Sequence, residues 1–199
     1  MSGKVLQLSQ KMPAARRRQI APNGVIGITV FCLTETMFFA GLISAHTLFR
    51  MQTTATDGWP PPGQPRLPIE ETALNSAALL ASGVFLFVAH QRYRAAASTA
   101  MRPMLASLFL GAFFVIFQGV EWVALLGEGL TMTSSAHGGF FYLIVGMHAI
   151  HAAAGLLVLG WAYLRLRRAE LVLSQLLTVE IFWYFVVLLW PILYWRVYL

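Results

Sequence analysis

Two histidines lie three residues apart within an apolar run, Tyr142–Trp161, which reads YLIVGMHAIHAAAGLLVLGW. His148 and His151 would share one face of a helix, because residues at positions i and i+3 are neighbours on its surface. Imidazoles placed in this way could bind a metal ion, ligate a haem or relay a proton. A zinc or copper site needs further ligands, and neither Cys32, the single cysteine, nor a carboxylate cluster supplies them obviously.

A haem held by two histidines needs them at equal depth on facing helices. His46 and His137 form the best such pair, since both fall near helix ends on the same side of the predicted membrane. His148 and His151 have no partner histidine at their depth on another helix. The sequence therefore predicts no cofactor and no metal held by this chain.

Glu121 offers the two central histidines a structural partner. It lies in the apolar run that precedes theirs, and a short connection makes the two helices antiparallel neighbours. Hydrogen bonds between membrane helices contribute about 1 kcal/mol each and fix their register. We predict a structural polar clasp, meaning a set of interhelical hydrogen bonds, formed by Glu121, His148 and His151. Proton handling by these groups is the alternative.

Glu35 lies near the middle of the first apolar run, and no basic residue is predicted at its depth. A lone carboxyl group in hydrocarbon favours its protonated, neutral form. Phe38, Phe39 and Leu42 follow within two turns and form a surface suited to another helix or to a lipid chain. We therefore predict a neutral, membrane-embedded carboxyl group at Glu35.

Five apolar segments must position these residues. Of the 199 residues, 58% are hydrophobic and 11% are charged, whereas a soluble domain carries about 25% charged residues. A membrane-spanning helix needs about 20 mostly apolar residues. The segments that meet this requirement are approximately 25–49, 72–90, 103–126, 138–164 and 176–197. The predicted fold class is all-α, an integral membrane bundle of five transmembrane helices in one domain over 20–199.

The basic residues predict the orientation of the bundle. The tail 1–19 and the connections 90–103 and 164–176 hold 11 of the 14 lysines and arginines. The positive-inside rule then places the basic tail and the N-terminus in the cytoplasm and the C-terminus outside, with a proline-rich outer loop over 50–71. The anionic inner leaflet explains the net charge of +6 without nucleic acid. No internal repeat of the kind typical of transporters is visible.

Several short motifs follow one another along the chain: TETMFF, WPP, LNSAALLASG, FQGVEW and HGGFFYLIVGMHAIH. In this order they resemble S-E-x-x-F-F, W-P-P, L-N-T-x-x-L-x-x-S-G, Q-x-x-E-Y and G-x-F-F-x-x-x-G-x-H-G-x-H of subunit III of the haem-copper respiratory oxidases, in its five-helix branch. The residues on motif positions include Glu35, Trp59, Asn75, Ser82, His90, Gln118, Glu121, His148, His151, Trp183 and Trp190.

The resemblance implies a non-catalytic subunit of a cytochrome c or quinol oxidase, whose complex reduces oxygen and pumps protons. It implies packing on subunit I, further contact with subunits II and IV, bound phospholipid and support of proton uptake. The haems and copper would lie in partner subunits, and Glu35 would face lipid or subunit I. The expected location is the bacterial cytoplasmic membrane, crossed several times.

Departures from the family pattern keep alternatives open. Ala149 stands at the second hallmark glycine, Tyr184 and Val187 stand where the last helix of the family has histidine and aspartate, and Glu180 has no evident counterpart. These changes are compatible with a subunit III-like accessory subunit of a nitric oxide reductase. A stand-alone b-type cytochrome or metal carrier is the second alternative.

Overall fold

The computed structural model describes residues 22–56, 58–59, 61–62, 65 and 67–199, so the predicted 1–19 tail lies outside the described residues. Within them the chain is helical and contains no strand. The membrane-spanning helices are α1 (Asn23–Thr56), α2 (Ile69–Ala95), α3 (Met101–Gly127), α4 (Ala136–Arg167) and α5 (Leu173–Leu193). A 3₁₀ turn, η1 (Ala97–Ala100), precedes α3, and a π-helical turn, η2 (Tyr194–Tyr198), continues α5. The predicted five-helix, all-α class is confirmed, since all five helices are long and apolar enough to span a membrane.

The first helix is longer than the sequence predicts. It continues past Phe49 to Thr56, so the connection to α2 is shorter than the predicted outer loop 50–71. The added segment, RMQTTAT, contains no glycine or proline. The hydroxyls of Thr53 and Thr54 donate hydrogen bonds to backbone carbonyls one turn earlier, at 3.0 and 2.7 Å. Local sequence therefore gives the helix no reason to stop before Gly58, which has a positive φ of 86°.

A short connection makes α3 and α4 antiparallel neighbours. Gly129, with φ of 88°, ends α3 in paired hydrogen bonds, one from its own N–H to Leu126 and one from the Leu130 N–H to Leu125. This is the Schellman pattern, which favours glycine at the left-handed position. Ser135 then caps α4, because its hydroxyl accepts a hydrogen bond from the Gly138 N–H at 3.0 Å.

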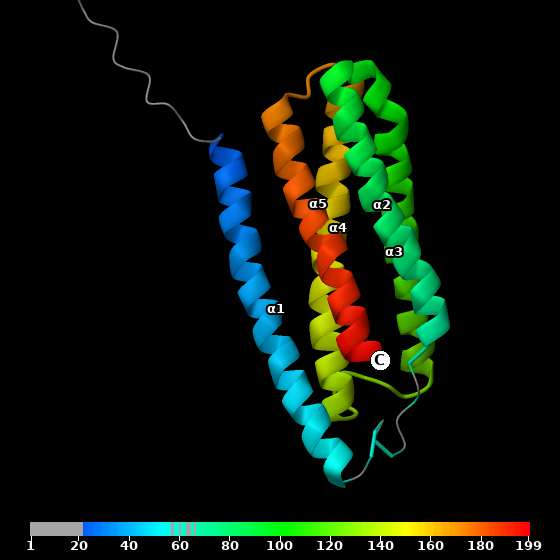
Figure 1. The fold of residues 1–199 in the computed structure, drawn as a ribbon. Helices are drawn as coiled ribbons and strands as arrows, with labels where there is room; N and C mark the ends of the chain where they lie inside the picture. The colour runs from blue at the N-terminus through cyan, green and yellow to red at the C-terminus, as the bar shows by residue number, and fades with distance from the viewer. Residues whose placement is uncertain (1–21, 57, 60, 63–64, 66) are drawn as a thin grey trace, which may run out of the picture.

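The helices form a four-helix group with α1 along one edge (Figure 1). In that view α2, α3, α4 and α5 run side by side, and α1 lies at one edge of them, where Gly24 at its N-terminal end packs close to Thr178 of α5. Of the most apolar part of α1, 11% is buried, against 56% for the helix made by α5 and η2. The C-terminal end of α1, the start of α2 and residue Leu199 mark the end that the sequence predicts to face outside, which we call the outer end.

A tryptophan of α5 fills the centre of the bundle. Trp183 is fully buried and lies against Gly111 of α3 and Gly155 of α4. A Cβ atom added at either glycine would lie 2.6 or 2.8 Å from the indole, closer than side-chain atoms can approach. The small-residue run Ala152–Gly155 thus admits a close neighbour from another helix, the Trp183 ring.

Candidate functional site: the buried polar contacts between the helices

Two tryptophans of α5 reach serines of α2. The indole N–H of Trp183 donates to the Ser82 hydroxyl at 3.0 Å, and that of Trp190 donates to the Ser76 hydroxyl at 2.7 Å. The tryptophans are seven residues apart, so they recur about two turns along one face of α5, and the serines follow six residues apart on α2. Buried indole and hydroxyl groups require such partners, and these contacts fix the register of α2 against α5.

The same interface is closed at both ends by further polar contacts. Toward the inner end, His90 Nδ1 lies 2.8 and 3.0 Å from the two carboxylate oxygens of Glu180, whose side chain is 5% exposed. Toward the outer end, the Tyr194 hydroxyl donates to the backbone carbonyl of Ile69 at 2.9 Å. Glu180, which had no evident family counterpart, therefore serves as the partner of His90.

Glu121 is bound by polar groups from α2 and α3. The Thr72 hydroxyl lies 3.1 and 3.0 Å from its two carboxylate oxygens, and the Gln118 amide N–H donates to one of them at 2.8 Å. The same amide also lies 3.2 Å from the Tyr198 hydroxyl, so the group extends into η2. Glu121 is thus the centre of a buried cluster that joins α2, α3 and the end of the chain.

The predicted contact of Glu121 with a histidine is wrong. At 1.5 Å per residue, Glu121 lies about 9 Å from the outer end of α3, whereas His148 lies about 18 Å from that of α4. Thr72 and Gln118 fill the space at the depth of the carboxylate. Both nitrogens of His148 are without a hydrogen-bond partner among the described residues, and its ring packs on Trp190 with centroids 5.0 Å apart.

His151 pairs with Glu35 instead. Its Nε2 lies 3.2 Å from a carboxylate oxygen of Glu35, and its Nδ1 lies 2.7 Å from the backbone carbonyl of Met147. A carbonyl oxygen only accepts, so Nδ1 carries a hydrogen. Nε2 then either accepts from a protonated Glu35 or donates to its carboxylate. In both cases one proton between the two groups would leave the pair without net charge.

Aromatic rings surround the Glu35–His151 pair. Phe31 and Phe39 of α1 and Phe182 and Phe185 of α5 lie around the His151 ring, with centroid distances of 5.6–6.3 Å. Such surroundings oppose an isolated charge and favour a neutral pair. The prediction that no basic group lies at the depth of Glu35 is therefore wrong, because His151 reaches it from α4. The Glu35 side chain remains 21% exposed.

His46 and His137, the best haem-ligand candidates, are both buried at the outer end. The Trp59 ring packs edge-on against each, with centroids 5.9 Å from His46 and 4.9 Å from His137. The indole therefore occupies space beside both imidazoles. Among the residues that the structure describes, no group of three or more histidine, cysteine, aspartate and glutamate side chains could hold a metal ion.

Most of the polar motif residues form hydrogen bonds that connect one helix to another. Ser82 also donates to the Ser107 carbonyl of α3 at 2.8 Å, and the Asn75 amide donates to the Phe114 carbonyl at 3.2 Å. The motif side chains that form a hydrogen bond to another helical element are Asn75, Ser82, His90, Gln118, Glu121, Trp183 and Trp190. Sequence reasoning missed Thr72, Ser76 and Tyr198, which complete these contacts.

Five spanning helices held together by buried polar contacts define a multi-pass membrane protein. The family model for cytochrome c oxidase subunit III matches residues 16–199. The chain belongs to this family. It is 31% identical over 176 residues to "Probable cytochrome c oxidase subunit 3" of Nocardia farcinica, covering 85% of this chain and 84% of the relative. It is 29% identical over 195 residues to the cytochrome c oxidase subunit 3 of Corynebacterium diphtheriae, covering 96% and 93%.

Proposed function

We propose that this chain is subunit III of a haem-copper terminal oxidase and that it does not itself perform the electron transfer. The family membership supports the first part, and the relatives reported above are named for cytochrome c oxidase rather than nitric oxide reductase. The second part rests on one observation. Seven motif side chains form hydrogen bonds between helical elements of the same chain, as expected of a scaffold.

The main partner in this proposal is subunit I, with subunits II and IV as further neighbours. An exposed apolar stripe along α3 suits a helical partner in the membrane, since its members recur at three- and four-residue intervals. The stripe consists of Phe109, Phe113, Ile116, Val120 and Val123. The exposed side of α1 would meet phospholipid or subunit I, and the complex would lie in the bacterial cytoplasmic membrane.

The Glu35–His151 pair would serve this function by holding α1 against α4. Sharing one proton allows a carboxyl group to remain deep in the membrane without net charge. The pair thereby keeps the partly exposed face of α1 in place beside its neighbour. Support of proton uptake would come through this placement, while the haems and copper of the partner subunits carry out the reduction of oxygen.

Co-purification in mild detergent tests this function. A tagged chain is expected to retain a haem-containing subunit I, and the complex is expected to show the same haem spectrum with Glu35→Gln or His148→Ala as with the wild-type chain. Loss of a haem band in either variant would contradict the scaffold role. A reduced-minus-oxidised haem signal from the isolated chain would favour a b-type cytochrome, and recovery of nitric oxide reductase subunits would favour that alternative.

A further inference from the structure

A cavity of about 180 Å³ lies inside the bundle, between α3, α4 and α5. Gln118 and Trp122 line it from α3, His148 and Ala149 from α4, and Trp190 from α5. His148 lies about 18 Å from the outer end of α4, so the cavity is well within the apolar part of the membrane. Lipid chains at that depth supply no hydrogen-bonding groups.

Three of the lining side chains carry buried polar atoms that have no hydrogen-bond partner within the described part of the chain. These atoms are both ring nitrogens of His148, Oε1 of Gln118 and Nε1 of Trp122. By contrast, the indole N–H groups of Trp183 and Trp190 each donate to a serine. Buried polar groups without a partner are uncommon in folded proteins. Their concentration around one cavity indicates a polar guest.

The lining presents both hydrogen-bond donors and acceptors. The Trp122 indole only donates, Oε1 of Gln118 only accepts, and a neutral His148 ring has one nitrogen of each kind. Water donates and accepts, and a cavity of about 180 Å³ far exceeds the roughly 10–15 Å³ that one molecule requires. An apolar guest would leave all of these atoms without a partner. The chemistry of the lining therefore favours water.

Gln118 connects the cavity to the Glu121 cluster. Its amide nitrogen lies 2.8 Å from a carboxylate oxygen of Glu121 and 3.2 Å from the Tyr198 hydroxyl. Oε1 of the same amide is directed away from these two partners, and the side chain lines the cavity. Water bound between Oε1 and His148 would thus span the difference in depth that prevents a direct contact of the histidine with Glu121.

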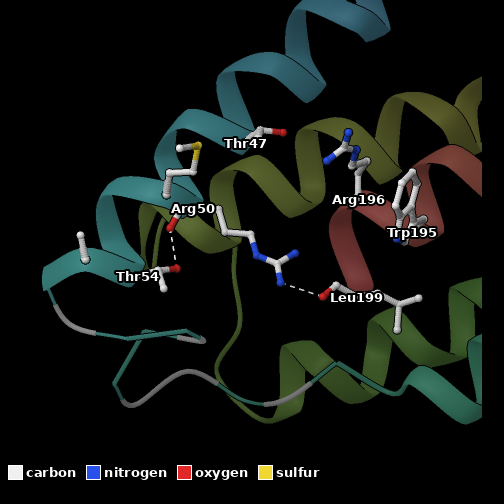
Figure 2. Close-up of a pocket in the computed structure, with 8 residues that line it drawn as sticks. Thr47, Arg50, Thr54, Trp195, Arg196 and Leu199 are labelled. Atoms are coloured by element: carbon white, nitrogen blue, oxygen red, sulfur yellow. Dashed lines mark hydrogen bonds between the residues drawn. The ribbon is translucent and has the colours of Figure 1, made fainter.

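A polar route leads to this cavity from the outer end. Tyr198, beside the Gln118 amide, also lines a second cavity of about 320 Å³ at that end of the bundle. Figure 2 shows Arg50 reaching across to a backbone oxygen of Leu199, to which it donates at 2.7 Å. This contact holds the segment that follows η2 against α1 and so keeps Tyr198 in place. Water can therefore reach the inner cavity without crossing lipid.

Ala149 stands at the boundary between the cavity and the exposed side of α4. Together with Trp122 it lines both the cavity and a separate groove of about 440 Å³. Ala153, one turn further along α4, lines the groove but not the cavity. A larger side chain at Ala149 would occupy space in the cavity, whereas one at Ala153 would not.

We propose that the cavity between α3, α4 and α5 binds a cluster of water molecules. The water molecules hydrogen-bond to His148, Trp122 and Gln118. Through the Gln118 amide they connect His148 to the Glu121 carboxyl group. The site lies within this chain and does not depend on the proposed function.

X-ray radiolysis of the protein, purified in mild detergent with its partner subunits, tests the site. Radiation splits bound water into hydroxyl radicals that oxidise adjacent side chains, and mass spectrometry measures the oxidation while a scavenger removes radicals from bulk water. Trp183 and Trp190 are both fully buried on α5, and of the two Trp190 lines the cavity. Trp190 is expected to be oxidised faster than Trp183. Ala149→Leu should abolish this excess, and Ala153→Leu, the matched control, should keep it.

Each contrary result is distinct. Equal oxidation of Trp183 and Trp190 in the wild-type protein would overturn the proposal, and this comparison needs no variant. An equal loss of the excess in Ala149→Leu and Ala153→Leu would place the water elsewhere and overturn it too. His148→Phe should also abolish the excess, because it removes both ring nitrogens, and an unchanged excess would contradict the site. Co-purification with subunit I is scored separately, so failure of the water site leaves the proposed function standing.

Discussion

The two sides of α5 are built differently. On the side that faces α2, polar contacts recur from the inner end to the outer end, beginning at Glu180 and ending at Tyr194. On the side that faces α1, aromatic rings make the contact and most of the apolar surface of α1 remains exposed. One side holds the bundle together, and the other leaves surface for molecules outside the chain.

The two carboxyl–imidazole pairs illustrate the same difference. Glu180 contacts His90 with both oxygens at 2.8 and 3.0 Å and is 5% exposed, whereas Glu35 contacts His151 with one oxygen at 3.2 Å and is 21% exposed. A short, two-oxygen contact in a buried interface tolerates little rearrangement. The longer, single-oxygen contact at Glu35 holds α1 beside α4 and leaves the carboxyl group partly exposed to a neighbour. We infer that the first pair serves stability and the second serves assembly.

The largest expected effect comes from removing the central indole on the α2 side. Trp183→Ala should lower the free energy of unfolding by about 3–5 kcal/mol, because it leaves a cavity between Gly111 and Gly155 and removes the donor to Ser82. Unfolding in mixed detergent micelles measures the change. Trp161→Ala, at a 43% exposed tryptophan of α4, is the control and should change it by less than about 1 kcal/mol. Equal losses would show that Trp183 is not the centre of the bundle.

Glu180→Gln should have the next largest effect. Replacing the carboxylate weakens its contact with His90 and should cost about 1.5–3 kcal/mol, the range for hydrogen bonds to charged groups. Glu170→Gln is a matched control, since Glu170 is half-exposed and lies 3.8 Å from Arg165. Exposed pairs of this kind contribute about 0.2–1 kcal/mol. A double-mutant cycle with His90→Ala should show coupling, and additive effects would mean that the two side chains act independently.

Thr72→Val should have a smaller effect. It removes a hydroxyl partner of Glu121 and leaves the Gln118 amide in place, so the expected cost is about 1 kcal/mol in the same unfolding measurement. Thr34→Val is the control, because the Thr34 hydroxyl bonds only to a carbonyl of its own helix on an exposed face. If the two threonine variants lose the same unfolding free energy, the Thr72 hydroxyl does not stabilise the protein through its contact with Glu121.

The fold was largely predictable from the sequence, and the partners of its polar residues were not. Five apolar runs with few charges require five spanning helices, whatever their arrangement. The way the helices pack against one another decides which group each histidine contacts. Glu121 and His148 belong to adjacent helices but differ by about 9 Å in depth, and His151 turns toward α1, a helix distant in sequence.

Some of the other contacts could have been predicted from the positions of the residues along their helices. His90 and Glu180 both lie toward the inner ends of their helices, and the seven-residue spacing places Trp183 and Trp190 on one face of α5. What the sequence lacks is the rotation of each helix about its axis, which brings these faces together. That rotation is set by packing around Gly111 and Gly155, where only the absence of a side chain admits the indole.

The smallest expected effect tests the α1 side directly. Glu35→Gln keeps a neutral side chain whose amide can donate to His151 Nε2, and the group is partly exposed, so the unfolding free energy should change by less than about 1 kcal/mol. Infrared difference spectroscopy should also show the wild-type carboxyl group responding to His151→Ala, because a carboxylate oxygen of Glu35 lies 3.2 Å from His151 Nε2. A stability loss as large as that of Glu180→Gln would mean that α1 is bound as tightly as α2. In that case the exposed face of α1 would be part of a rigid bundle, and assembly with neighbours would have to depend on the α3 stripe instead.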